Sequence, residues 1–250
     1  MHRIFIPRKA IREDRADVVG AEARKVRSVL RLATGDELLA TDGIGCDYLL
    51  KIERMTKDVV SCNVLATIKP QCPETRNEIV LMQCCLSSSK MDQVIDKATQ
   101  LGASKFMPVT SEKSKFRGDD SHFKKKVERW ARIARTGALQ SGRGIFPPVE
   151  AIMPLTNAIQ IPSECDKRLL FSPSDEARAA CDILPELLSS LEPDESVYLL
   201  IGPESGLSDA ERTAAMKHDF IPVRMGRRTL RAETAPMVAL ALVLHYLGEL

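Results

Sequence analysis

The chain has 250 residues, 44% of them hydrophobic and 28% charged, and its 36 Lys and Arg nearly balance its 34 Asp and Glu. These values exclude a largely disordered chain and allow one large domain or two smaller ones. The seven cysteines form no CxxC pair, and no apolar run approaches the roughly 20 residues of a membrane span. We therefore expect reduced cysteines in a cytoplasmic protein, with no metal and no membrane segment.

The first 70 residues alternate polar and apolar side chains in short runs separated by turn residues. This pattern predicts strands at residues 3–7, 36–43, 46–55 and 59–68. Strands of this length and spacing are typical of a small antiparallel barrel. One helix is predicted from Ala21 to Leu32, with Val26, Val29 and Leu30 on its apolar side.

The segment "KPQCPETRN" at residues 69–77 contains two prolines and is mostly polar. Such a composition is typical of a linker. We therefore place the domain boundary here, with one domain at residues 1–70 and a second at residues 78–250.

The second domain alternates apolar runs with segments of helical length. Strands are predicted at residues 79–86, 105–110, 168–172, 197–202 and 220–226. This alternation predicts an α/β domain, a parallel sheet with helices on its faces, and such sheets bind ligands at the carboxyl ends of their strands. Three turns are expected there: "FSPSD" at 171–175, "GPESG" at 202–206 and "MGRRTLRAET" at 225–234.

The turn "GPESG" matches none of the common catalytic loops. No GK pair follows it, which excludes a P-loop, and Glu204 stands where the nucleophile elbow GxSxG requires serine. Its glycines would let the backbone approach a ligand closely, and Ser208 with Glu211 forms a capping box for the next helix. A ligand-binding turn and a purely structural turn both remain open at this point.

Charge is distributed unevenly along the second domain. Residues 111–145 contain ten Lys and Arg against four Asp and Glu, whereas residues 146–220 contain five against fourteen. A helix in the basic stretch places Val127, Trp130, Ala131, Ala134 and Ala138 on one face and Lys125, Arg129 and Arg132 on another. The basic face is either a solvated helix surface or a contact surface for a polyanion.

Four arginines, at 224, 227, 228 and 231, directly precede a last helix that is apolar nearly all round. Glu233 and Pro236 suit the first turn of that helix. A helix without a polar face must be buried on several sides, either against the sheet and a second subunit or inside a monomer.

Together these segments resemble the bacterial RsmE-type 16S ribosomal RNA methyltransferases of the SPOUT superfamily, which methylate N3 of uridine 1498. The resemblance covers nearly the whole chain and rests on "HRIFIP", "VLRLATGDELLATDG", "KMDQVIDKATQLGASKFMPVTSEKS", "RWARIARTGALQSGR", "LLIGPESGLSDAE" and "MGRRTLRAETA". It implies an α/β fold with a PUA-like β-barrel at residues 1–70 that helps to hold RNA. Residues 78–250 would form a trefoil-knotted domain that binds S-adenosylmethionine and acts as a homodimer on 16S ribosomal RNA, within the small ribosomal subunit.

The resemblance also assigns candidate residues. The cofactor would be held by Phe171, Ser172, Pro173, Ile201, Gly202, Pro203, Glu204, Gly206, Met225, Gly226, Arg228, Thr229 and Leu230. RNA contacts are expected from Arg8, Arg31, Lys113, Lys115, Arg117, Arg129, Gln140 and Arg143. The chain departs from the family at Ser205, Lys113, Leu139 and Arg227, and Ser205 would be strained if its position required a positive φ.

Methylation at N3 of uridine requires loss of a weakly acidic proton and stabilisation of the carbonyl oxygens that gain charge. Arg231 suits the second task, and Glu233 is a candidate proton acceptor, directly or through water, or else a structural carboxylate of the helix. Two alternatives remain: a non-catalytic ribosomal RNA-binding or assembly protein of the same fold, and a SPOUT methyltransferase with another RNA target.

Overall fold

The computed structural model describes residues 2–116, 118–173, 176–193 and 195–250, which form two compact units. The first unit contains Met1–Glu74 and Ala138–Phe146, and the second contains Thr75–Gly137 and Pro147–Leu250. The division after Glu74 lies within the segment 69–77 that we predicted as a linker. The sequence did not predict that Ala138–Phe146 would join the first unit.

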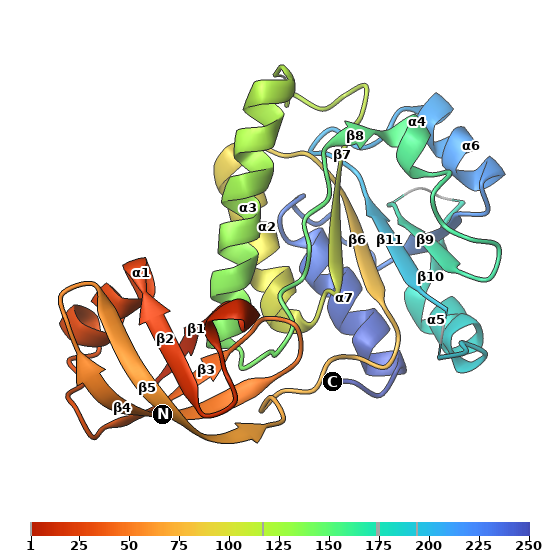
Figure 1. The fold of residues 1–250 in the computed structure, drawn as a ribbon. Coiled ribbons are helices and arrows are strands. Elements are labelled where there is room, and N and C mark those ends of the chain that lie inside the picture. Colours follow the sequence, from red (N-terminus) through yellow and green to blue (C-terminus); the bar gives the residue numbers. More distant parts are fainter. Residues whose placement is uncertain (1, 117, 174–175, 194) are drawn as a thin grey trace. The chain divides into compact units, whose positions relative to one another are not determined.

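The first unit is a curled five-stranded sheet with the strand order β1-β3-β4-β5-β2 (Figure 1). Its elements are β1 Arg3–Phe5, the 3-10 helix Arg8–Ala10, β2 Arg15–Val19, α1 Gly20–Arg24, the π-helix Lys25–Val29, β3 Glu37–Thr41, β4 Asp47–Met55 and β5 Val59–Ile68. The four predicted strands are confirmed, and β2 is an addition. The prediction of an antiparallel sheet is wrong for β1, which pairs with β3 in parallel. Its connection to β3 contains β2 and three short helices, the 3-10 helix, α1 and the π-helix, instead of a hairpin turn.

The predicted helix at 21–32 is present only as α1 and the π-helix that follows it. Val26 is buried, but Val29 is 71% exposed, so the prediction for Val29 is wrong. The N–H of Leu30 bonds to the carbonyl oxygen of Lys25, five positions back. This wider turn breaks the 3.6-residue periodicity from which the apolar side was predicted.

The second unit is built on a seven-stranded sheet in which every strand pair is parallel, with the order β10-β12-β9-β11-β6-β7-β8. Its strands are β6 Ile79–Cys84, β7 Lys105–Thr110, β8 Met153–Pro154, β9 Lys167–Phe171, β10 Arg178–Ala179, β11 Val197–Ile201 and β12 Ile221–Arg224. Its helices are α2 Ser88–Leu101, α3 Asp120–Gln140, α4 Leu155–Ala158, α5 Ala180–Ser189, α6 Asp209–Lys217 and α7 Ala235–Tyr246. The predicted parallel α/β sheet is therefore confirmed.

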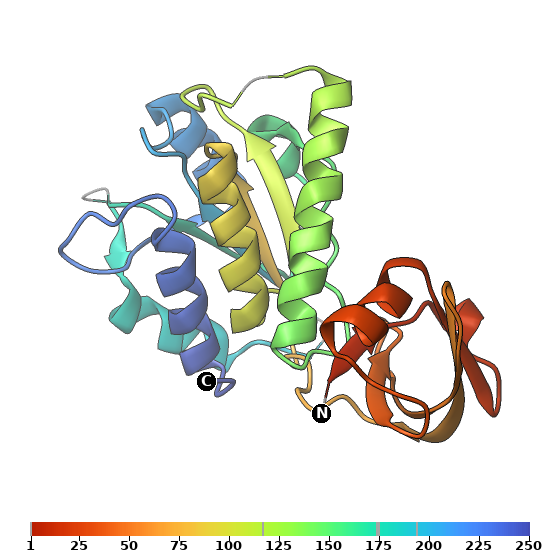
Figure 2. The same cartoon turned by 90° about the vertical axis from the view of Figure 1, so that its left-hand side faces the viewer.

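Helices cover both faces of this sheet (Figures 1 and 2). One apolar cluster joins α2, α3, α5 and α7 to strand residues such as Leu81 and Leu199. The other joins α4 and α6 to strand residues such as Val80 and Leu200. Because the central strands are buried on both faces, their sequences are mostly apolar, as in VYLLI of β11.

The apolar helices pack as their sequences predict, with one exception. In α3, Trp130 and Ala134 are buried, whereas Ala131 is exposed. Helix α7 lies over β11, between α2 and α5 (Figure 2). Its residues Leu240 and Val243 are fully buried, so α7 holds together the helical layer on this face.

Among the described residues, no helix is long and apolar enough to cross a membrane. All seven cysteines are free thiols. Within the same residues, no group of three or more His, Cys, Asp or Glu side chains is placed to hold a metal ion.

Candidate functional site

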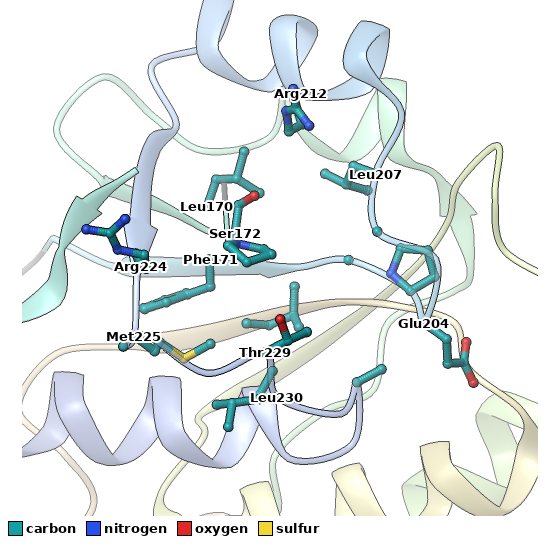
Figure 3. Close-up of a pocket in the computed structure, with 18 of the residues that line it drawn as sticks. Leu170, Phe171, Ser172, Glu204, Leu207, Arg212, Arg224, Met225, Thr229 and Leu230 are labelled. Carbon is teal, nitrogen blue, oxygen red and sulfur yellow. The ribbon is translucent and has the colours of Figure 1, made fainter. Parts of the chain in front are cut away.

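A cavity lies at the carboxyl ends of three neighbouring strands, β12, β9 and β11. All thirteen residues predicted to bind the cofactor line it, and the structure adds Leu170, Leu207, Arg212, Arg224, Ala232 and Ala235. Figure 3 shows labelled side chains from the three turns around this one space. The turns, far apart in sequence, are adjacent because their strands are.

The lining combines apolar side chains with a few polar groups. Phe171, Met225 and Leu230 supply apolar surface, and Ser172 and Thr229 supply hydroxyl groups. Arg212 Nε is buried and has no hydrogen-bond partner among the described residues. This composition suits a ligand with an apolar ring and polar ends.

The turn 202–206 takes its shape from glycine at one position. Gly206 has φ +69°, in the left-handed region that favours glycine. Among the described residues other than glycine, only Arg31 and Asp219 have a positive φ, so Ser205 carries no such strain. Ser205 instead donates a hydrogen bond from Oγ to the carbonyl oxygen of Lys113 at 3.0 Å.

Glu204 lies at the edge of the cavity and turns its carboxylate away from the middle (Figure 3). Lys90 Nζ, near the start of α2, lies 3.1 Å from Glu204 Oε1. Partial burial opposes ionisation, but hydrogen bonds from its own backbone, from Lys90 and from the backbone of Ser87 outweigh it and lower the pKa of Glu204. The glutamate of "GPESG" therefore anchors the turn to α2.

The two predicted catalytic residues lie outside the cavity lining, on the segment that leads from β12 to α7. Arg231 is exposed, whereas Glu233 is 17% exposed and its Oε2 lies 3.5 Å from Lys90 Nζ. Helix α7 begins at Ala235 with Thr234 as its N-cap, so the reading of Glu233 as a first-turn carboxylate is wrong. Lys90 thus joins this segment to the turn after β11, a role that sequence reasoning missed because no motif marks it.

Three of the predicted RNA contacts in the first unit have exposed side chains: Arg8, Arg31 and Gln140. Arg8 is 60% exposed, lies 3.7 Å from Asp42, and covers the ring of Tyr48. Arg143 differs, because its side chain is only 3% exposed and its guanidinium forms an ion pair with Glu74. The structure therefore corrects its assignment: Arg143 stabilises the first unit and offers no surface for a phosphate.

The predicted RNA contacts in the second unit are partly engaged by neighbours. Lys115 is exposed, and Lys113 donates from Nζ to the carbonyl oxygen of Leu207 at 3.2 Å. Arg129 binds both oxygens of Asp92, with Nη2 to Oδ2 at 2.7 Å, while its side chain stays 56% exposed. Arg117 lies outside the described residues.

Residues 73–244 match the family model of the RNA methyltransferase domain. A ribosomal RNA small subunit methyltransferase E of Bacillus subtilis is 29% identical over 226 residues, which cover 90% of this chain and 88% of that protein. Its namesake in Synechocystis is 28% identical over 240 residues, 96% of this chain and 76% of that protein.

Two solved structures are similar over nearly their whole length. One is a ribosomal RNA small subunit methyltransferase E of Neisseria gonorrhoeae bound to S-adenosylmethionine, with a TM-score of 0.87, 26% identity, and coverage of 98% of this chain and 97% of that one. The other is a methyltransferase of Legionella pneumophila with bound S-adenosylmethionine, with a TM-score of 0.85, 26% identity, and coverage of 97% and 96%. These likenesses confirm the predicted fold class for the chain.

Proposed function

We infer that this chain, which belongs to the RNA methyltransferase domain family and within it to the RsmE-type enzymes, methylates ribosomal RNA with S-adenosylmethionine. The observation that carries the inference is that the turns after β9, β11 and β12 together line one cavity, with apolar side chains and a few polar groups. We further propose that the target is N3 of uridine 1498 in 16S ribosomal RNA, as the resemblance implies.

The chemistry of the cavity residues fits S-adenosylmethionine. Phe171, Met225 and Leu230 would pack against the apolar parts of the molecule, and Arg212, whose Nη2 lies 3.1 Å from Asp209 Oδ1, would donate to a carboxylate from its unpartnered Nε. The bound cofactor supplies an electrophilic methyl group. The turns of the cavity serve to orient that group and to exclude water from it.

The chain's own residues supply the acid-base chemistry. We propose that Arg231 stabilises the negative charge that develops on the uridine carbonyl oxygens. Glu233 accepts the N3 proton, directly or through water, and Lys90, 3.5 Å away, holds its carboxylate in place. Lys90 also contacts Glu204, so the same ammonium group aligns the proton acceptor with the cofactor turn.

We propose that the domains act as the resemblance implies. Residues 1–70 form the PUA-like RNA-binding domain, and residues 78–250 form the catalytic domain. Arg8, Arg31, Lys113, Lys115, Arg117, Arg129 and Gln140 then contact the RNA. Because lysine and arginine release counterions from phosphates, binding should weaken steeply between low and moderate salt. Equal affinity at both salt concentrations would argue against these contacts.

We propose a homodimer formed through α7. Val238, Ala241 and Leu242 lie on the helix face opposite the buried residues and are only half-buried in the single chain. A second copy covering them would complete the burial that an apolar helix requires. Light scattering coupled to size-exclusion chromatography should report twice the chain mass, and Leu242→Glu should halve it.

The free cysteines support a reducing compartment, and we propose the cytoplasm.

The decisive experiment on function uses ribosomal RNA from a strain that lacks this gene. Mass spectrometry should find one uridine unmethylated, and the purified protein with S-adenosylmethionine should restore the methyl group on isolated small subunits. A protein that binds RNA but restores no methyl group would be a non-catalytic RNA-binding or assembly factor. A methyl group on a different nucleotide would reassign the target.

A further inference from the structure

Two segments of the second unit, about ninety positions apart, are joined by hydrogen bonds that the proposed function does not use. The backbone N–H of Glu112 donates to Glu211 Oε1 at 2.7 Å. Ser205 Oγ donates to the carbonyl oxygen of Lys113 at 3.0 Å, and Lys113 Nζ donates to the carbonyl oxygen of Leu207 at 3.2 Å. We call these three bonds the clasp. They connect the basic segment after β7 with the turn that follows β11 and with the first turn of α6.

Glu211 is the fixed point of the clasp. The residue is only 7% exposed, and its two carboxylate oxygens have separate partners. Oε2 accepts from the backbone N–H of Ser208 at 2.8 Å, as part of the capping box of α6, while Oε1 accepts from Glu112. A buried carboxylate with both oxygens satisfied holds its donors in a defined geometry. The start of α6 and the basic segment are therefore positioned by one side chain.

Each end of the clasp belongs to a different binding surface. Leu207 lines the cavity between β9, β11 and β12. Lys113 and Lys115 are exposed residues of the basic segment, which Ser114 anchors to the end of β6 through a bond from its Oγ to the carbonyl oxygen of Cys85 at 2.8 Å. The turn that forms one wall of the cavity is therefore bonded directly to the basic segment.

We propose that the clasp couples the two binding events, so that cofactor in the cavity raises the affinity for RNA, with Ser205 and Glu211 as the positioning residues. The proposal rests on the proposed function of the cavity and of the basic segment. Linkage requires the effect to be reciprocal: RNA raises the cofactor affinity by the same factor. Ser205 contributes because its hydroxyl donates the bond to Lys113.

The test measures binding with two defined probes, S-adenosylhomocysteine and small ribosomal subunits from a strain that lacks this gene. Calorimetry gives the affinity for S-adenosylhomocysteine alone, and filter binding gives the affinity for subunits with and without saturating S-adenosylhomocysteine. For the unmodified chain we expect at least about a five-fold tightening of subunit binding. We call the ratio of subunit affinities with and without S-adenosylhomocysteine the coupling factor. In Ser205→Ala and in Glu211→Gln this factor should fall below about two.

Two variants serve as controls. Ser190→Ala removes an exposed serine hydroxyl at the end of α5, outside the clasp, and should keep the full coupling factor. Lys115→Ala should weaken subunit binding with and without S-adenosylhomocysteine alike, which leaves the factor unchanged. Thermal melting confirms that each variant is folded, and Ser205→Ala keeps the test valid if Glu211→Gln melts early.

The outcomes separate the two proposals. If S-adenosylhomocysteine does not bind the unmodified chain, the proposed function itself fails. If both probes bind but S-adenosylhomocysteine leaves subunit affinity unchanged, or if Ser205→Ala and Glu211→Gln both retain the full factor, the clasp does not couple the sites and the inference is overturned.

Discussion

The cavity and the basic surface of the second unit differ in what holds them in place. The cavity is walled by turns that extend from adjacent buried strands, so the backbone itself fixes their spacing. The basic surface consists of long side chains on α3 and on the segment after β7. Several of these are held by particular partners, such as Asp92 for Arg129 and the carbonyl oxygen of Leu207 for Lys113.

This difference separates two kinds of functional dependence. At a site built on backbone turns, ligand affinity should depend strongly on substitutions that add bulk to a turn. Activity should depend strongly on the few side chains at the edge of the site. A surface built on charged side chains should lose affinity in small increments, because each exposed charge contributes little and salt screens it. The predictions that follow test this contrast, from the largest expected effect to the smallest.

Arg231→Ala should have the largest effect. We expect methyl transfer to fall by about 10²–10³-fold, because a charge-stabilising group near the reacting atoms is lost. Arg231 does not line the cavity, so the affinity for S-adenosylmethionine should change by less than about two-fold. Single-turnover methyl transfer and calorimetry measure the two quantities.

Arg227→Ala is the matched control, since Arg227 is exposed on the same segment and also lies outside the cavity lining. It should keep nearly full activity. Full activity in Arg231→Ala would remove Arg231 from the mechanism.

The sequence alone could predict those parts of the site that local patterns determine, namely the strands and the turns that follow them. The apolar runs gave the strands, and parallel pairing then brings the turns at 171–173, 202–206 and 225–230 to one edge of the sheet. No local pattern reveals that Arg143 is buried against Glu74, 69 positions away, or that Lys90 bridges two carboxylates. Such pairings depend on the tertiary fold.

Arg143→Ala should have the next largest effect, on stability and not on catalysis. Its side chain is 3% exposed and pairs with Glu74, so the variant leaves a partly buried carboxylate without its cation. The free energy of unfolding should fall by about 3 kcal/mol, which thermal or denaturant unfolding measures.

Arg129→Ala is the control for that variant, because it removes an exposed ion pair with Asp92. Its cost should be below about 1 kcal/mol. If Arg143→Ala were as stable as the unmodified chain and bound RNA more weakly with a reduced salt dependence, the original assignment of Arg143 as a phosphate contact would be restored.

Gly202→Val should weaken S-adenosylmethionine binding by at least about ten-fold. A Cβ at Gly202 would meet the backbone nitrogen of Leu207 at 3.4 Å and its Cγ at 3.5 Å, and the valine methyl groups would extend further into Leu207. The turn must then move at the cavity wall. Calorimetry measures the loss, with Ala151→Val at an exposed site as the control. Unchanged affinity would exclude the turn from the cofactor site.

The smallest expected effect concerns the pH dependence of stability. It arises from Glu204, at the edge of the cavity. Its folded-state pKa is lowered from an ordinary value of 4.5, so the ionised carboxylate stabilises the fold above that pH, and the contribution is lost as the pH falls through the lowered pKa. Glu204→Gln should therefore melt slightly earlier than the unmodified chain from pH 7 to about 5, and the difference should shrink below about pH 4.5. Glu186→Gln, at a side chain that is 75% exposed, controls for the loss of a charge. A difference that persisted undiminished at pH 3 would mean that Glu204 stabilises the turn by its shape, and the link between Lys90 and the cavity wall would then not be electrostatic.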